Sequence, residues 1–336
     1  MADKLGYMFG DFGNDFTFIL SSTFLMKFYT DVMGVSAGIV GVMMMVARIV
    51  DAFTDVTMGQ IVDRSRPTEK GKFTPWLKRM CGPVAVASVL MYAVWFKDMP
   101  MAFKVFWMFL TYLLWGSVCY TGINIPYGSM ASAISENAKD RQELSSWRTI
   151  GATLANMVIG VVLPMFVYYE DAAGNTVLSG NNMAIAGVIC SICAVICYLL
   201  CYNLTTERVK IEKETEKFNL IHLVKYLVSN RALIGIIVAA IMLLLSQLTL
   251  SGMGQYIYPN YFGSKEALST ANMITAVLTI ILAFVLPSFV DKVGKKELAI
   301  FGGVIGSIAL IAAFFVHTDN LAVWIGFYAV AYFGIA

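Results

Sequence analysis

Three charged side chains stand close together within a long apolar stretch of the sequence. Arg48, Asp51 and Asp55 follow one another at spacings of three and four residues, with Thr54 among them. These spacings place the four side chains on one face of a helix. Two carboxylates one turn apart in an apolar medium must share a proton, bind a cation or pair with the arginine. Carboxylate and hydroxyl oxygens suit hard cations such as Na⁺ or Li⁺, so we predict a site for a monovalent cation or a proton.

A second interpretation of the same residues is a static ion pair. Arg48 would then pair with one of the two acids and tie helices together without any part in binding. One arginine cannot neutralise both Asp51 and Asp55, so we favour the cation site and expect Arg48 to be a gating or structural charge.

Two more acids and an amide lie in the first apolar stretch. Asp11 and Asp15 are one helical turn apart, and Asn14 lies between them. Asp15 is deeper in the stretch and is the better candidate for a binding residue. Asp11 lies close to the end of the stretch, where a water-exposed or helix-capping acid is expected.

A third polar group combines aromatic, amide and arginine side chains. Tyr120 and Asn124 are one turn apart, and Pro126 nearby leaves a backbone carbonyl free for a cavity to use. Arg148 either extends to the membrane surface or turns its planar guanidinium into the cavity to bind paired oxygens. Acids, amides, an arginine and aromatic rings together suit a sugar, although the same set would hold an amino acid or a polar drug.

The elements that position these residues are membrane-spanning helices. The chain has 336 residues, is 58% hydrophobic and 14% charged, and has a mean hydropathy of +0.71. Soluble domains carry about 25% charged residues, and a soluble fold could not hide this much apolar surface. Charged residues inside a membrane are functional candidates by default.

Spans of about 20 apolar residues cross a bilayer. The sequence predicts full spans at 12–33, 37–62, 76–96, 103–133, 143–169, 182–203, 231–262, 267–290 and 298–316. A tenth begins near residue 320, and we expect the chain to end inside it.

Positive charges predict the orientation. Most Lys and Arg residues fall between spans on the side of the N-terminus, and the opposite loops hold Lys97, Lys104 and Lys265. We therefore expect a multi-pass protein of the cell membrane with a cytoplasmic N-terminus. The charged segment 204–230 is predicted to be a cytoplasmic linker between a six-helix bundle, 1–203, and an incomplete second bundle, 231–336.

A motif recurs at equivalent places in the two predicted bundles. Asp63 and Arg64 follow the second span of the first bundle, and Asp291 follows the second span of the second bundle. Two halves of six helices are typical of the all-α major facilitator fold, so we expect that fold, with the second half reaching only into span 10. We expect Asp63, Arg64 and Asp291 to be gating charges.

Other function classes lack support in the sequence. The net charge is +2, and no run of six like charges predicts nucleic-acid binding. The histidines, His222 and His317, lie outside the span centres, so we expect no catalytic site, no enzyme activity, no metal site and no cofactor. Cys190, Cys193 and Cys197 share one apolar stretch with a fourth cysteine and are expected to pack between helices.

Several motifs carry a resemblance to a known family. They are Gly6-Tyr7, GDFGND (10–15), FYTDVMG (28–34), ARIVDAFTD (47–55), Met58-Gly59, GKFTPW (71–76), YTGINIPYG (120–128) and the segment 141–148. Together they resemble the glycoside–pentoside–hexuronide:cation symporters, the melibiose-permease family. The resemblance covers the whole first half and, more weakly, the rest. It implies alternating access and sugar uptake coupled to Na⁺, Li⁺ or H⁺.

The resemblance also implies roles for single residues. The implied cation-binding residues are Asp51, Asp55 and Thr121, to which we add Thr54, and the implied sugar-binding residues are Asp15, Tyr120, Asn124 and Arg148, to which we add Asn14. This chain departs from the melibiose permeases, which have Lys at Asn14, Asp at Asn124, Trp at Gly128 and Asn at Thr54. A preference for α-galactosides therefore does not carry over, and Na⁺ and H⁺ both remain candidate coupling ions.

The expected function is cation-coupled symport of a glycoside, pentoside or hexuronide sugar. The expected partners are a small sugar, a monovalent cation and the lipid bilayer, and the full-length protein is expected to act as a monomer. One alternative is a carrier of a lipid or drug, with a more apolar cavity and no cation dependence. The other is a membrane sensor that transports nothing.

Overall fold

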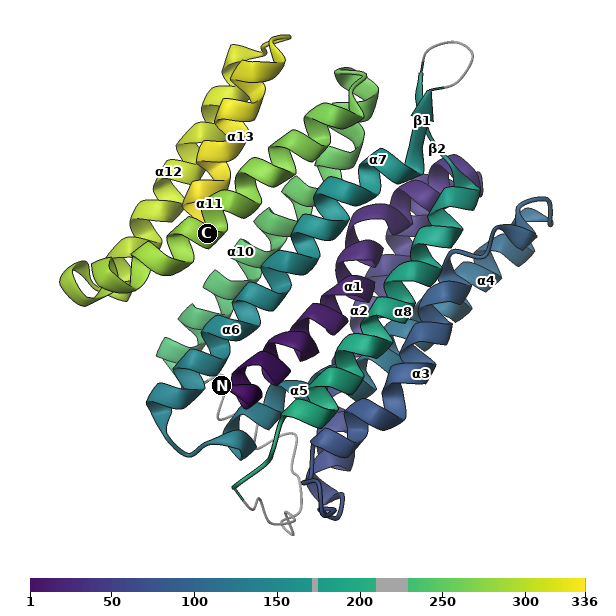
Figure 1. The fold of residues 1–336 in the computed structure, drawn as a ribbon. Helices are drawn as coiled ribbons and strands as arrows, with labels where there is room; N and C mark the ends of the chain where they lie inside the picture. The colour runs from purple at the N-terminus through teal and green to yellow at the C-terminus, as the bar shows by residue number, and fades with distance from the viewer. Residues whose placement is uncertain (171–174, 210–228, 336) are drawn as a thin grey trace.

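The computed structural model describes residues 1–170, 175–209 and 229–335, without the side chains of 138, 283–284, 286–292 and 295. The described helices form two groups (Figure 1). The first half comprises α1 (Ala2–Lys27) with the π-helical turn η1 (Phe28–Val32), α2 (Ala37–Arg64), α3 (Thr74–Met91), α4 (Met101–Leu113) with the π-helical segment η3 (Leu114–Tyr120), α5 (Thr121–Ile134), α6 (Ala138–Met157) with η4 (Val158–Val162), α7 (Leu163–Val167) and α8 (Gly180–Leu204). The second half comprises α10 (Arg231–Tyr256) with η5 (Ile257–Tyr261), α11 (Lys265–Val293), α12 (Lys295–Val316) and α13 (Leu321–Ile335).

Every predicted span is a helix in the structure. Within the described part of the chain, 8 helices are long and apolar enough to cross a membrane, and α13 is a shorter apolar helix. The first helix, α1, is not among the eight, because polar residues interrupt its apolar sequence. The division at 204–230 stays a prediction, since 210–228 lie outside the described residues.

One prediction about secondary structure is wrong. The fifth span was expected to continue to residue 169, but a two-stranded hairpin replaces its end. Strand β1 (Tyr168–Glu170) pairs antiparallel with β2 (Thr176–Leu178), with Tyr168 opposite Leu178. Aromatic and β-branched residues favour strands, and such residues at the end of an apolar run look like a continuation of the span.

Helix α1 is the centre of the first half, where it lies between α6 and α8 (Figure 1). A Cβ atom at Gly10 would overlap the Tyr127 ring, and one at Gly151 would overlap the backbone carbonyl of Met8. Glycine at these two positions therefore permits the backbones to approach closely, as is common between membrane helices. Tyr127 stacks on Tyr7 at a ring distance of 4.7 Å and donates a hydrogen bond of 2.7 Å to its carbonyl oxygen.

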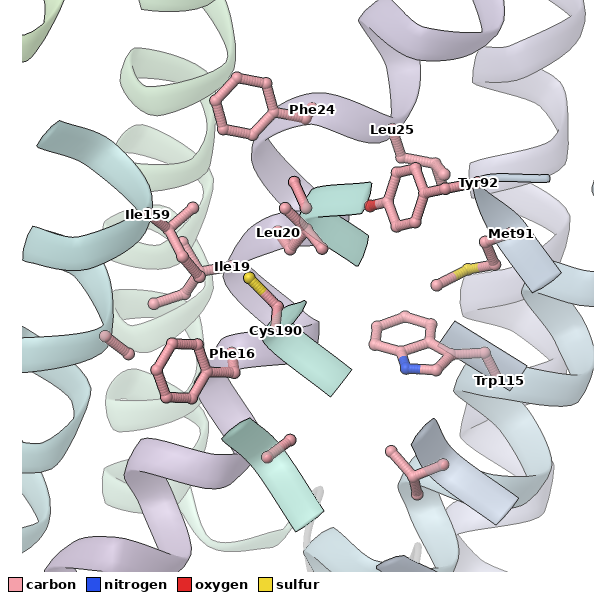
Figure 2. Packing of buried hydrophobic residues seen from close by; sticks show 14 of the residues in the cluster. Phe16, Ile19, Leu20, Phe24, Leu25, Met91, Tyr92, Trp115, Ile159 and Cys190 are labelled. Atoms are coloured by element: carbon pink, nitrogen blue, oxygen red, sulfur yellow. The ribbon is translucent and has the colours of Figure 1, made fainter. Parts of the chain in front are cut away.

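The apolar core of this half lies between α1, α3, η3 and α8. Figure 2 shows Leu20, Leu25, Tyr92, Trp115 and Cys190 in this core, and each is almost fully buried. The cysteines of α8 are free, and Cys190, Cys197 and Cys201 are buried. The core fixes α1 against its neighbours and so positions the polar residues on the remaining face of α1.

Glu207 connects the segment after α8 to the loop between α2 and α3. Its carboxylate accepts hydrogen bonds from the backbone amides of Lys72 (2.7 Å), Phe73 (2.9 Å) and Thr74 (2.6 Å). The Thr74 hydroxyl adds a bond of 2.6 Å. A carboxylate at a helix N-terminus satisfies free amides and interacts favourably with the helix dipole, so Glu207 stabilises the start of α3.

Candidate functional site

A cavity of about 750 Å³ lies between the two halves. It is lined by polar and aromatic side chains from α1, α2, η3, α5 and α6 and by residues of α10 and α13. Eight of the residues predicted from the sequence line it, namely Asp15, Arg48, Asp51, Asp55, Tyr120, Thr121, Asn124 and Arg148. The fold therefore brings the predicted cation-binding and sugar-binding groups into one space.

The first acid of α2 is neutralised by its neighbours. One oxygen of Asp51 accepts a hydrogen bond of 2.5 Å from Ser117, and the other lies 3.2 Å from the Arg48 guanidinium. Arg48 also donates a bond of 2.8 Å to the hydroxyl of Tyr112. The ion pair of the alternative interpretation therefore exists between Arg48 and Asp51, and it leaves Asp55 unpaired among the described residues.

The second acid of α2 has a different environment. Asp55 accepts a hydrogen bond of 2.7 Å from Thr121, and no cationic side chain in the described part of the chain pairs with it. The Thr121 hydroxyl also lies 3.1 Å from the carbonyl oxygen of Gly116, in the π-helical segment η3. Such segments depart from the regular α-helical bonding pattern and often occur at functional sites. Asp55, Thr121 and Gly116 thus form a group of oxygen atoms with one uncompensated negative charge.

Two of the predicted binding residues lie outside the cavity lining. The Thr54 hydroxyl lies 3.2 Å from both the Val50 and Asp51 carbonyl oxygens, so it bonds to its own helix. Asn14 is buried, accepts a bond of 2.9 Å from Tyr198 and approaches Asn124 at 3.5 Å. The Thr54 hydroxyl thus bonds within α2, and Asn14 lies against the Asn124 amide without lining the cavity.

The arginine of α6 faces the cavity. Arg148 donates from Nε to Asp11 at 3.0 Å, and its guanidinium lies 5.7 Å from the centre of the Tyr127 ring. The Arg148 side chain is 46% exposed, so the rest of its guanidinium remains open to the cavity. The expectation of a water-exposed or capping Asp11 is wrong, because Asp11 is only 6% exposed and lies inside the bundle with its arginine partner.

Aromatic rings and an acid line the cavity together with Arg148, and we call this part of the lining the wall. Phe18 stacks on Tyr120 at 5.7 Å, and Trp115 contacts Tyr120 at 5.3 Å, and all three line the cavity. Asp15 lines the same wall and pairs with no cationic side chain among the residues that the structure describes. The sequence analysis did not identify Phe18 and Trp115. An aromatic residue near a cluster of polar residues on one helix could have indicated them as candidates for the cavity lining. This wall offers an apolar ring face beside charged and amide groups.

A buried lysine joins the two halves at one end of the cavity. Lys27 is 1% exposed, donates bonds of 3.1 Å each to the Gln255 carbonyl and the Asn260 side chain, and lies 3.6 Å from Asp31. Its ammonium also lies 5.0 Å from the centre of the Tyr256 ring. Sequence reasoning missed Lys27, although a lysine inside an apolar span is a candidate by its type alone.

Other bonds between the halves occur at this same end. The Asn272 amide donates to the Gly160 carbonyl at 2.7 Å, and Ser269 donates to the Val161 carbonyl at 2.9 Å. We call this end, where η1 and η5 both contact β2, the opposite face, and the end where the chain begins the N face. Among the described residues, all side-chain hydrogen bonds between the two halves lie toward the opposite face. The cavity is thus closed at the opposite face.

Two of the predicted gating charges lie at the N face, whereas Arg48 lines the cavity. Asp63 and Arg64 are at the end of α2 and do not line the cavity. The side chain of Asp291 lies outside the described residues. A gating role for these three residues stays a prediction.

The chain is similar to known transporters. Residues 6–336 match the model of a family described as MFS/sugar transport protein. A glucuronide carrier protein homolog from Escherichia coli (strain K12) is 30% identical over 332 residues, which cover 98% of this chain and 70% of the relative. A putative glycoside/cation symporter from the same organism is 33% identical over 215 residues, 63% of this chain and 44% of the relative. The crystal structure of a D-xylose-proton symporter superposes with a TM-score of 0.64 at 17% identity and covers 100% of this chain and 80% of that one.

Proposed function

Because this chain belongs to the MFS/sugar transport protein family, we propose that it carries a glycoside, pentoside or hexuronide across the cell membrane together with Na⁺ or H⁺. It is a multi-pass membrane protein with the major facilitator fold, its family and structural neighbours are transporters, and it is not an enzyme. The relatives named as a glucuronide carrier homolog and a glycoside/cation symporter are consistent with the glycoside–pentoside–hexuronide:cation symporters.

One observation carries the proposal. Asp55, with no cationic partner among the described residues, shares a cavity with Arg148, Asn124 and the ring of Tyr120. An uncompensated carboxylate inside a membrane is costly, so binding of a cation or proton there lowers the cost of closing the cavity. A lipid or drug carrier would not need this charge.

The two sites are coupled through shared elements. Thr121, which bonds Asp55, and Asn124 lie one turn apart on α5, and Tyr120 directly precedes Thr121. A cation that orders Thr121 therefore also fixes the start of α5 for the sugar. By linkage, sugar must tighten cation binding by the same factor as the cation tightens sugar binding.

The arrangement of the halves suggests one state of an alternating-access cycle. The halves are bonded near the opposite face through Lys27. With the N-terminus in the cytoplasm, as the positive charges predict, this is an inward-facing state. The halves would rock about the central site to reach the outward-facing state.

Uptake into sealed membrane vesicles tests the proposal. Vesicles that contain the protein are given labelled β-glucosides, xylosides, galactosides and glucuronides under an imposed Na⁺ or H⁺ gradient. We expect gradient-driven accumulation of at least one sugar and its loss in Asp55→Asn. Uptake that ignores both gradients, or that Asp55→Asn preserves in full, would overturn cation coupling, and no uptake of any of these sugars would overturn the sugar assignment.

A further inference from the structure

A second, smaller cavity continues from the first toward the opposite face. Its volume is about 190 Å³. It shares Ile19, Thr23, Thr149, Ala152, Asn156, Gln247, Ser251 and Tyr332 with the main cavity and adds Thr153, Gly160, Asn272, Thr275, Ala276 and Thr279. We call the space lined by these fourteen residues the annex. Both halves line it, with α1, α6 and η4 on one side and α10, α11 and α13 on the other.

The annex differs from the main cavity in charge. Four acids and two arginines line the main cavity, whereas no ionisable acid, lysine or arginine lines the annex. Its polar groups are hydroxyls and amides, which form hydrogen bonds without requiring an ion to lose its water. Burial of a charged ligand group here would leave that charge unpaired, which is costly. The annex therefore suits an uncharged ligand rich in hydroxyl groups.

Several of its hydrogen-bonding groups are available to a ligand. The amides of Asn156 and Gln247 and the hydroxyl of Ser251 make no hydrogen bond to any residue in the described ranges. Asn272 donates its amide to Gly160, which leaves its side-chain oxygen as an acceptor. These groups come from α6, α10 and α11 and so reach a ligand from both halves.

Three threonines of the annex contribute an apolar surface instead. The Thr153 hydroxyl bonds to the Thr149 carbonyl at 2.8 Å, and the Thr275 and Thr279 hydroxyls each bond to their own helix at 2.9 Å. Their hydroxyls are thus already satisfied, and their methyl groups remain for contact. Amides combined with small apolar groups match a sugar ring, which has a hydroxyl rim and an apolar face.

We propose that the annex binds a second, uncharged sugar unit, so that the transported substrate is a glycoside of two units. The proposal rests on the function proposed above, in which Arg148, Asp15 and Asn124 bind the first unit in the main cavity. At about 30 Å³ for each water in the liquid, 190 Å³ corresponds to roughly six waters, which is room for one sugar ring. Asn156 and Gln247 are then specificity-determining residues for the second unit.

Calorimetric titration of the purified protein tests this with matched ligand pairs. The probes are methyl β-glucoside with cellobiose, methyl β-xyloside with xylobiose, and methyl β-galactoside with lactose, in the presence of Na⁺ at low pH and at neutral pH. The variants are Asn156→Ala and Gln247→Ala. The matched control is Thr270→Val, which removes a hydroxyl that bonds to the Glu266 carbonyl of its own helix at 2.7 Å and lines neither cavity.

We expect the wild-type protein to bind at least one disaccharide more tightly than its methyl glycoside. Each of the two variants should raise the dissociation constant of the disaccharide about tenfold, a typical effect of a lost polar contact. The dissociation constant of the methyl glycoside should stay within about twofold of the wild-type value. Thr270→Val should leave the affinity for both ligands unchanged. The temperature of unfolding of each variant verifies that it is folded, and Gln247→Asn, which keeps the amide, should restore part of the disaccharide affinity if Gln247→Ala unfolds.

The outcomes separate the two proposals. The annex proposal would be overturned if a variant lost equal affinity for both members of a pair. It would also be overturned if the wild-type protein bound both members equally. Either result would leave the proposed sugar transport intact. If no sugar of either size binds to the wild-type protein, the proposed function and the annex proposal both fail.

Discussion

The Lys27 ammonium lies 3.1 Å from the backbone carbonyl oxygen of Gln255, so a side chain of α1 binds the main chain of α10. A second bond of 3.1 Å reaches Asn260 in η5. Because Lys27 is 1% exposed, water does not replace these partners. An ammonium group that bonds across two halves links the closure of the cavity to the burial of a charge.

Lys27→Met should loosen the closure at the opposite face. The substitution leaves the Gln255 carbonyl and the Asn260 amide without their donor, and hydrogen bonds to charged groups contribute about 1.5–3 kcal/mol. We expect backbone amides of 257–263, in the second half, to exchange hydrogen for deuterium about tenfold faster, measured by mass spectrometry. Lys104→Met is the matched control, because Lys104 bonds the Met33 carbonyl at 2.7 Å within the first half. Equal exchange in Lys27→Met and wild type would contradict a gating role.

The two threonines predicted for the cation site should behave differently. Thr121→Val removes the hydroxyl that bonds Asp55 at 2.7 Å, and we expect the cation concentration for half-maximal sugar uptake to rise about tenfold. Thr54→Val should leave it within about twofold, because the Thr54 hydroxyl bonds only to its own helix. A larger effect at Thr54 than at Thr121 would mean that the cation binds elsewhere on α2.

Arg148→Lys should weaken sugar binding although it keeps the charge. A planar guanidinium can bond Asp11 through Nε and still present its other nitrogens to a ligand, whereas an ammonium has one bonding centre. We expect the dissociation constant for sugar to rise about tenfold to a hundredfold, measured by calorimetry. Arg208→Lys is the control, because Arg208 pairs with Asp3 at 2.9 Å away from the cavity. Wild-type affinity in Arg148→Lys would show that only the charge matters.

Glu207→Gln should lower stability and leave the binding residues untouched. The carboxylate accepts three backbone bonds at the start of α3, and its neutral replacement loses the charge-assisted part of each. We expect the free energy of unfolding to fall by about 2 kcal/mol, measured as a lower midpoint temperature of thermal unfolding in detergent. Glu136→Gln is the control, because Glu136 is exposed and bonds no described residue. Equal midpoints for the two variants would show that the cap contributes nothing.

The sequence predicted the helices well because apolar runs of the required length are a strong signal. It also identified eight of the residues that line the cavity, since a charged or polar side chain in such a run is conspicuous. Periodicity gives the face of a helix but not the side-chain conformation. Thr54 shares a face with Asp51 and Asp55, yet its hydroxyl bonds back to its own helix.

Long-range partners were beyond the reach of the sequence. The burial of Asp11 depends on Arg148, and the burial of Lys27 depends on Gln255 and Asn260, which lie on other helices. Spacing along one helix contains no information on such pairs. The hairpin at β1 and β2 was missed because its residues extend the apolar pattern of the preceding span.

The close packing at Gly10 means that the proposed sugar site can fail without a change in any of the residues proposed to bind sugar. A methyl group at Gly10 would displace the Tyr127 ring, and Tyr127 is the surface on which the Arg148 guanidinium lies. A collection of inactive transport variants should therefore include Gly10 substitutions alongside those of Asp11 and Arg148. If residues were assigned from the loss of transport alone, Gly10 would be assigned wrongly as a sugar-binding residue.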